Sequence, residues 1–342
     1  MLVSYSIWTD RVSEVSVIAA VDTMSAPAEQ HSSANHRTSE FTSSIGATTI
    51  VFHLLESVQD LLGVHTHDIS TLRSQSLSIN LGNIIESSQI IWQSKACCGH
   101  AVVRCSTKIV VKIVPNLDDY TEYTSMQYLA QHAPEIPAPK PLGLVLSNRT
   151  SYIFMSFVPG LTVKIWSKLS KKQKISISVQ LNDVLLKLRQ LKVPDGVSLG
   201  GVCGEGCKDT RGHTRICQET ISTCADFEDF KFSNPHFGSS EYVALLRGLS
   251  PSHSATVFFS HRDLRAENVV VQPDQHGNYF ITGILDWEKS GFYPDYFECT
   301  KATSNMSSSD ADDWYLYLPT CASPTTYSLQ WLVDRIWDIH IA

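Results

Sequence analysis

The chain has 342 residues and a formal net charge of -7, and 43% of its residues are hydrophobic. This length and apolar content allow one large core or two smaller ones, and they exclude a small domain held together by disulfides or metal ions. The acidic balance argues against a nucleic-acid partner, because proteins that bind nucleic acids carry a basic patch.

The composition also predicts where the protein resides. Charged residues interrupt the first apolar run, unlike in a secretory signal, so we expect a cytoplasmic protein whose nine cysteines are reduced thiols. The Cys97-Cys98 and Cys203/Cys207 pairs lack the doubled spacing of a zinc site. No uncharged apolar run approaches the roughly 20 residues of a membrane span, so no membrane partner is expected.

The first part of the chain changes from a polar tail to predicted helix and strands. Residues 1–48 are expected to be a disordered tail, because residues 24–48 are rich in Ser, Thr and Ala and contain few large apolar groups. From Ile50 to Leu62 apolar residues recur at helical spacing, which predicts an amphipathic helix and a globular domain that begins near residue 49. Short β-branched runs then predict consecutive antiparallel strands at residues 84–85, 90–92, 101–105 and 109–114.

A helix and a connector follow these strands. The helix is predicted from Asp118 to His132, because the acidic residues at its start suit the helix dipole. Three prolines in residues 135–143 end it. A strand over residues 151–160 then finishes in Pro-Gly, a turn that suits a connector between two lobes.

The chain beyond this connector reads as mainly helical. Ser170 and Gln173 match a capping box, and apolar residues from Ile177 to Leu191 form the stripe of the helix that follows. A further helix is predicted around Trp331 to Ile339.

The stretch of residues 257–288 carries the clearest chemical signal. It reads as strand, polar loop, strand, turn, strand, and residues 269–271 and 281–285 are expected to pair around a turn near Gly277. Antiparallel pairing brings Asn268 and Asp286 to the same end of this hairpin. Two oxygen ligands there suit Mg²⁺, which needs one or two protein groups in addition to phosphate oxygens.

Asp263 lies in the loop that opens the hairpin, five residues before Asn268. Its carboxylate is placed to accept a proton from an attacking hydroxyl, whereas His261 is expected to be a scaffold residue of the same loop. Any one of these residues alone would be unremarkable in function, but H-x-D-x-x-x-x-N followed by a strand, a turn and I-L-D is a joint pattern that indicates a kinase-type catalytic loop.

SHRDLRAENVVV (260–271) and ITGILDWEKSGFYPDYFE (281–298) resemble the aminoglycoside phosphotransferase family, especially its fungal branch. The segments MSFVPGLTV (155–163), IPAPKPLG (136–143) and VVKI (110–113) resemble the hinge, the connector and the lysine strand of that family. The resemblance covers roughly residues 84–340. It implies an α+β, bilobal protein-kinase-like fold, with a small antiparallel-sheet N-lobe at 49–156 and a mainly helical C-lobe at 157–342.

The resemblance also implies site residues and cofactors. ATP and Mg²⁺ would be bound, with Lys112 on the α- and β-phosphates, Glu122 paired with that lysine, and the hinge residues Met155 and Phe157 beside the nucleotide. Lys108, on the same strand face, is an alternative to Lys112, and Asp118, Asp119 or an exposed ion pair could account for the charges instead.

The remaining site residues belong to the catalytic loop and the metal site. Asp263, His261 and Arg265 would form the catalytic set, and Asn268 and Asp286 would hold the metal. We therefore expect a monomeric enzyme that phosphorylates a hydroxyl of a small molecule.

Three features depart from the family pattern. A glycine-rich phosphate loop is missing, since QSKACCGH (93–100) has Gly99 as its only glycine. Ser156 stands where many relatives carry an acidic residue. Arg262 stands where small-molecule kinases often have glycine, and it is interpreted either as a protein-kinase-like feature or as a surface ion pair.

Two alternative functions stay open. A protein Ser/Thr kinase is favoured by Arg265, at the position of the catalytic-loop lysine, but Trp287-Glu288 after Asp286 and the lack of A-P-E argue against it. An inactive kinase-like binding protein is the other alternative, and the presence of Asp263, Asn268 and Asp286 together argues against it. The identity of the phosphate acceptor does not follow from the sequence.

Overall fold

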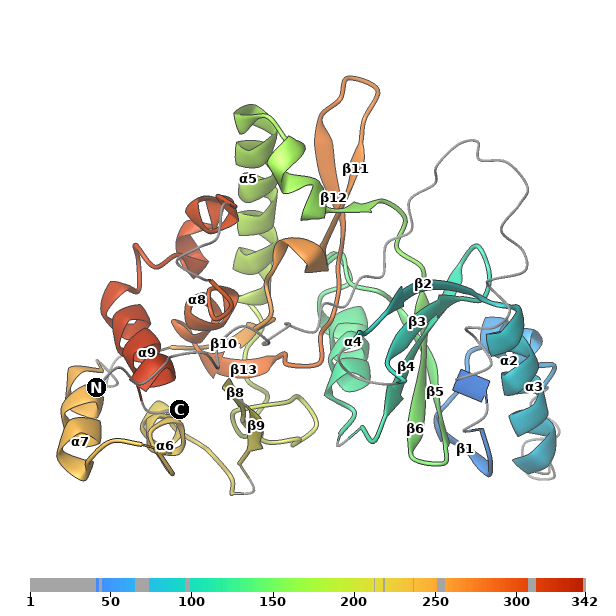
Figure 1. Cartoon of the computed structure of the whole chain (residues 1–342), viewed down its shortest axis with the longest axis horizontal. Helices are drawn as coiled ribbons and strands as arrows, with labels where there is room; N and C mark the ends of the chain where they lie inside the picture. The colour runs from blue at the N-terminus through green and yellow to red at the C-terminus, as the bar shows by residue number, and fades with distance from the viewer. Residues whose placement is uncertain are drawn as a thin grey trace, which may run out of the picture.

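The structure is a computed structural model that describes residues 41–42, 45–64, 74–95, 99–117, 119–211, 213–217, 219–235, 237–250, 256–306 and 312–340. Most of the predicted tail, up to residue 40, lies outside the described residues, as do Cys97, Cys98 and Asp118. The described chain forms two lobes, a sheet-rich N-lobe and a larger C-lobe that contains most of the helices (Figure 1).

The N-lobe is built on an antiparallel six-stranded sheet in the order β1-β5-β6-β4-β3-β2. Strand β4 pairs with β6 along its whole length and with β3 over Val110–Ile113, and its residues are almost all buried. The helices α2 and α3 pack on one side and α4 on the other (Figure 1). The N-lobe elements are β1 (Thr48–Phe52), α2 (Glu56–Leu62), α3 (Ser74–Ser87), β2 (Gln89–Gln93), β3 (Ala101–Arg104), β4 (Ile109–Pro115), α4 (Thr121–His132), β5 (Pro141–Ser147) and β6 (Thr150–Ser156).

The C-lobe begins after the connector that follows β6. Helix α5 packs on the β11–β12 hairpin, which in turn pairs with the short strand β7. The C-lobe elements are β7 (Leu161–Thr162), η2 (Val163–Lys168), α5 (Lys171–Leu188), β8 (Lys208–Arg211), β9 (His213–Ile216), α6 (Cys224–Lys231), α7 (Ser240–Leu249), β10 (Val257–Ser260), η4 (Ala266–Asn268), β11 (Val269–Pro273), β12 (Tyr279–Ile284), β13 (Gly291–Pro294), α8 (Phe297–Ala302), η5 (Trp314–Tyr317), η6 (Thr320–Ala322) and α9 (Ser328–His340).

Two predictions for the start of the N-lobe are wrong. The helix expected from Ile50 begins only at Glu56, because residues 48–52 pair with β5 as a strand, with Ile50 opposite Val145. The strand expected at Ile84-Ile85 is the end of α3, where Leu77, Leu81 and Ile85 recur every four residues on one buried face.

The helix predicted from Asp118 is shorter than expected. It begins at Thr121, because the Asp119 carboxylate accepts a hydrogen bond from the Thr121 amide at 2.8 Å and so satisfies one of the free N–H groups of the first turn. The other predicted strands of the N-lobe, the hairpin around Gly277, the Ser170/Gln173 capping box and the C-terminal helix are confirmed.

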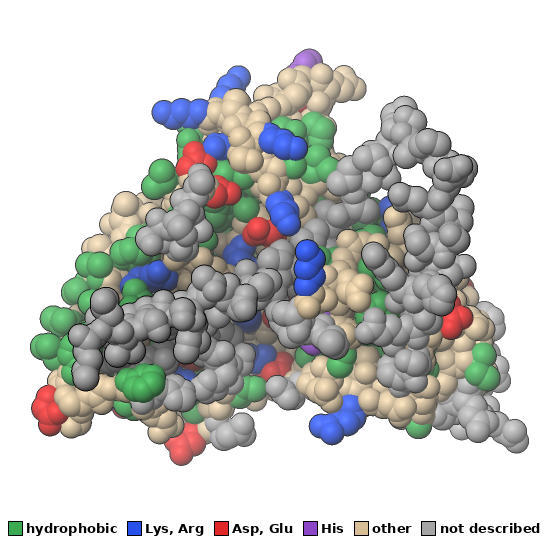
Figure 2. Space-filling view, in the orientation of Figure 1, with side chains coloured by type: hydrophobic (Ala, Val, Ile, Leu, Met, Phe, Trp, Pro, Cys, Tyr) green, Lys and Arg blue, Asp and Glu red, His purple; other side chains and the backbone are tan. Residues whose placement is uncertain are grey.

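Apolar side chains also remain exposed on the C-lobe. They gather along the left margin of the molecule, where Figure 1 places α9 (Figure 2). The large apolar side chains exposed on α7 and α9 are Leu245, Leu249, Leu329, Leu332 and Ile339. No helix in the described part of the chain is both long enough and apolar enough to span a bilayer.

Candidate active site

The catalytic-loop segment of residues 261–265 connects β10 to the hairpin, and His261 fixes its shape. His261 is fully buried, with its Nε2 2.8 Å from the carbonyl oxygen of Leu285 and its Nδ1 accepting the Asp263 amide at 3.2 Å. This network assigns the proton to Nε2. His261 therefore holds the backbone of Asp263 from behind, which is the scaffold position expected for it.

Two hydrogen-bond donors and one more distant ammonium surround the carboxylate of Asp263. Arg265 Nη2 lies 2.7 Å from Asp263 Oδ2, and Asn268 Nδ2 donates to Asp263 O at 2.8 Å and to Oδ2 at 3.3 Å. Lys289 Nζ lies 3.6 Å from the same Oδ2. The loop therefore presents one oriented carboxylate with two cationic side chains beside it, a setting for hydroxyl activation next to phosphate charge.

Asn268 and Asp286 meet at the end of the hairpin, as predicted. The Leu285 amide donates to Asn268 O at 2.8 Å, so the pairing continues past the strand ends and carries Asp286 to the side of Asn268. Asp286 has a left-handed backbone with φ of 69°, a conformation that a residue other than glycine adopts rarely and that concentrates at functional sites. Asn268 Oδ1 is buried and has no hydrogen-bond donor within the described residues, so this oxygen is free to bind a cation.

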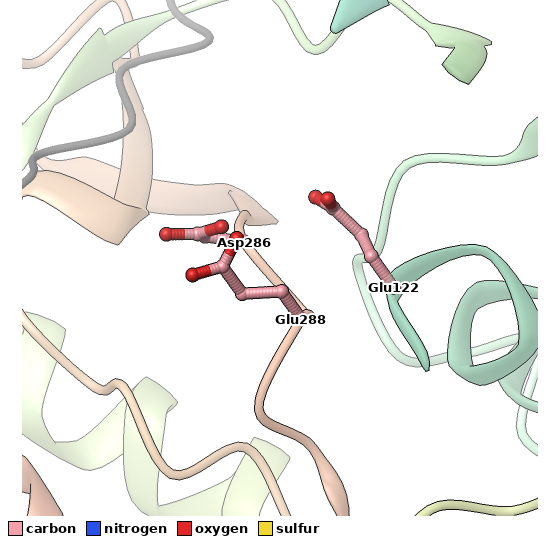
Figure 3. A group of neighbouring side chains, drawn as sticks. All are labelled: Glu122, Asp286 and Glu288. Atoms are coloured by element: carbon pink, nitrogen blue, oxygen red, sulfur yellow. The ribbon is translucent and has the colours of Figure 1, made fainter. Parts of the chain in front are cut away.

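Lys112 on β4 joins the two lobes. Its ammonium is almost fully buried and contacts Glu122 of α4 at 2.7 Å, Asp286 at 2.8 Å and Glu288 at 3.2 Å. Figure 3 shows Glu122 pointing from α4 toward Asp286 and Glu288, which come from the segment after β12. Lys108 is exposed, and its backbone carbonyl accepts from Phe157 at 2.8 Å, so within the described residues Lys112 and not Lys108 contacts these carboxylates.

Three carboxylates share this single ammonium. Burial alone would lower the pKa of Lys112, but Asp286 and Glu122 outweigh it and raise that pKa well above its ordinary value. Burial opposes ionisation of Asp286, yet Lys112 holds the pKa of Asp286 below its usual range. The pKa of Glu122 rises to about 7, because burial and the two other carboxylates outweigh the effect of Lys112.

The cluster fits a divalent cation. One oxygen each from Glu122, Asp286 and Glu288 lie within 4.8 Å of one another, and Asn268 Oδ1 lacks a donor in the described structure. Mg²⁺ prefers such hard oxygen ligands, and an added positive charge would relieve the excess of negative charge around Lys112.

The predicted hinge residues lie away from this cluster. Met155 is fully buried and pairs with Val110, and the Phe157 ring lies 4.1 Å beneath the guanidinium of Arg104. Ser156 exchanges hydrogen bonds with Lys140, accepting from its amide at 2.8 Å and donating to its carbonyl at 2.9 Å. The serine therefore fixes the start of the connector, and contacts to a nucleotide at Met155 and Phe157 stay a prediction.

The expectation that Arg262 forms a surface ion pair is wrong. Its side chain is buried, donates to Lys208 O at 2.6 Å and to Lys289 O at 2.9 Å, and stacks on the Tyr293 ring at 3.9 Å. Its own amide donates to Glu298 at 2.9 Å. Arg262 thus stabilises the catalytic loop from the protein interior. Its hydrogen-bond partners are backbone carbonyls, which the sequence pattern does not reveal.

Two side chains near the reacting groups were not expected from the sequence. Glu288 joins Lys112, and Lys289 approaches Asp263. Glu288 lies two residues after Asp286, but Asp286 is left-handed and Glu288 lies in a turn, so the alternation of a strand gives no signal for it. Lys289 gave no signal of this kind either.

Comparison with known proteins supplies an independent finding. A model described as the phosphotransferase enzyme family matches residues 103–318, more than half of the chain. No curated protein sequence matches the chain significantly.

Similar solved structures are aminoglycoside phosphotransferases. A thermostable mutant of APH(4)-Ia in its apo form has a TM-score of 0.50 and 16% identity, covering 73% of this chain and 86% of that chain. The streptomycin-ATP-APH(2″)-IIa ternary complex has a TM-score of 0.48 and 15% identity, covering 76% and 88%. The first of these structures establishes the bilobal kinase-like fold.

Proposed function

Because this chain belongs to the phosphotransferase enzyme family, we propose that it transfers the γ-phosphoryl group of ATP, with Mg²⁺, to a hydroxyl group of a small molecule. The observation that carries this proposal is the contact of Lys112 with Glu122 from one lobe and Asp286 from the other, at 2.7 and 2.8 Å. This contact assembles a phosphate-binding cation and metal-binding oxygens at one point.

Each residue has a role in the proposed reaction. Asp263 orients the acceptor hydroxyl and takes its proton as the new O–P bond forms and the bond to the leaving nucleotide breaks. Lys112 binds phosphate oxygens, and Arg265 and Lys289 lie where negative charge accumulates. Asn268 and Asp286 would hold Mg²⁺, which neutralises phosphate charge when it is bound.

The segment after Asp286 supports a small acceptor over a protein substrate. Strand β13 begins at Gly291 and pairs with β10, and α8 begins at Phe297. These few residues leave no room for the activation segment on which a protein kinase supports an extended peptide. We propose that the enzyme is a cytoplasmic monomer, with the N-lobe and C-lobe meeting at residues 156 and 157.

The experiment is a screen with labelled ATP over aminoglycosides, sugars, amino alcohols and fungal metabolites, with generic peptide substrates in parallel. We expect labelled product from at least one small molecule and none with Asp263→Asn. Efficient labelling of peptides alone would establish the protein-kinase alternative. The absence of any thermal shift of the wild type at millimolar magnesium-ATP would favour the inactive binding protein.

A further inference from the structure

Lys208 is a second buried lysine that links the lobes, and the proposed reaction does not use it. It lies on β8 of the C-lobe, and its side chain is almost fully buried. Its ammonium contacts Asp119 at 2.7 Å, the Thr121 hydroxyl at 2.8 Å and the Glu288 carbonyl at 3.1 Å. An ammonium has three N–H donors, and each of them has an acceptor here.

Two of the three partners of Lys208, Asp119 and Thr121, lie at the N-terminus of α4. Asp119 also accepts the Thr121 amide, so the lysine contacts both the first residue of the helix and the carboxylate that binds the amide of that residue. Glu122, the partner of Lys112, is the next residue after Thr121. Because a helical turn is rigid, fixing Thr121 also limits where the Glu122 carboxylate can lie.

A second contact joins α4 to the chain segment just before Lys208. The hydroxyl of Thr124 donates to Glu205, which lies three residues before Lys208. Thr121 and Thr124 are one turn apart, so the two contacts hold the first turn of the helix on one side.

The other end of this connection is fixed to the catalytic loop. The carbonyl of Lys208 accepts from Arg262 at 2.6 Å, and its amide donates to the Tyr293 hydroxyl at 3.1 Å. Gly200 exchanges hydrogen bonds with Phe292 of β13 at 2.8 and 2.9 Å, which anchors the start of the segment. Residues 200–208 are thus held against the loop that carries Asp263.

We propose that Lys208 is a positioning residue that couples α4 to the catalytic loop and holds Glu122 against Lys112 before a nucleotide binds. This proposal rests on the proposed function for its consequence in catalysis. Lys208 does not touch the reacting groups, so its effect passes through Glu122 and Lys112. Protein kinases regulate the placement of the corresponding helix, whereas here a C-lobe lysine fixes it.

The test is hydrogen exchange of the nucleotide-free protein, which requires no knowledge of the acceptor. In Lys208→Met, exchange at the amides of α4 should be about tenfold faster than in the wild type, while the amides of α5 stay unchanged. Lys208→Arg should restore part of the protection. The matched control is Lys174→Met, which removes an ion pair with Asp313 inside the C-lobe and should leave α4 unchanged.

Magnesium-ATP binding gives the second measurement. We expect Lys208→Met to weaken this binding about five- to tenfold, and combining it with Asp119→Asn should add little, because the ion pair that Asp119→Asn weakens is already lost in Lys208→Met. If Lys208→Met does not fold, Asp119→Asn weakens the ion pair and Thr121→Val removes the hydroxyl acceptor of Lys208, and each variant should raise exchange in α4.

Unchanged exchange in α4 for folded variants, or equal effects in Lys174→Met, would overturn the proposal. Its failure is distinguishable from failure of the proposed function. A wild type that ignores magnesium-ATP refutes the proposed function, whereas the exchange measurement reports on the coupling alone.

Discussion

Lys112 and Lys208 are both buried, both bridge the lobes, and both use three contacts, yet their surroundings differ in charge. Lys112 faces three carboxylates, whereas Lys208 faces one carboxylate, one hydroxyl and one carbonyl. The charges of Lys208 and Asp119 therefore cancel, and each N–H group of the ammonium has an acceptor. The group around Lys112 is negative and retains an unbonded oxygen of Asn268 within the described structure, as expected where a ligand supplies the missing charge.

The largest loss of activity is expected from replacing Asp263 of the catalytic loop or Asp286 beside Lys112. Asp263→Asn should lower turnover by about a thousandfold, because the amide cannot take the proton, while nucleotide binding persists. Asp286→Asn should also shift the magnesium dependence to higher concentration. Parallel magnesium titrations of the two variants check this, and identical titrations would contradict the separate roles.

Removal of the Lys112 ammonium, which the three carboxylates share, should have the next largest effect, a loss of stability. In Lys112→Met the three carboxylates lose their common partner, so the free energy of unfolding should fall by about 3–5 kcal/mol at neutral pH without magnesium. Urea unfolding measures this loss, and magnesium should recover part of it. A stability equal to that of the wild type would show that the carboxylates do not repel one another.

The pH dependence of stability should distinguish Glu122 from an ordinary surface acid. Its pKa of about 7 in the folded protein lies above the ordinary glutamate pKa of 4.5. Its contribution to stability is therefore complete below pH 4.5 and is lost as the pH rises through about 7, by at most about 3 kcal/mol. Unfolding of the metal-free protein between pH 5 and 8 should show this loss, and Glu122→Gln should remove it. A slope that survives in the variant belongs to another group.

The smallest expected effect is stabilisation by magnesium alone. At a concentration ten times its dissociation constant, Mg²⁺ should add about 1.4 kcal/mol to the free energy of unfolding. Asp286→Asn should abolish the gain, whereas Lys174→Met should retain it because the partner of Lys174, Asp313, is not one of the clustered carboxylates. An equal gain in Asp286→Asn would place the ion elsewhere.

The catalytic-loop pattern could be predicted because its parts are local. Asp263, Asn268 and Asp286 lie within 24 residues on a loop and a hairpin, and strand pairing brings the last two together. The family match confirms the resemblance that rests on these residues, and the fungal branch stays a prediction.

The rest of the site depends on contacts between distant segments. Lys112 and Glu288 are separated by 176 positions, and the partners of Arg262 are backbone carbonyls, so local patterns carry no sign of either. In the N-lobe, the spacing of the apolar residues from Ile50 onward predicted a helix. Residues 48–52 instead form a strand, because they hydrogen-bond to the edge of β5. Pairing with a distant strand overrides local periodicity there.

The left-handed backbone of Arg262, with φ of 66°, has a consequence for the evolution of the loop. Glycine would adopt this conformation without strain, yet replacing the arginine would leave a void beside Tyr293 and two carbonyls without their donor. Replacing Arg262 by the glycine of other small-molecule kinases would therefore remove the strain of the left-handed backbone but would lose the packing and hydrogen bonds of the arginine side chain. We expect residues 262 and 293 to change together among the homologues of this chain.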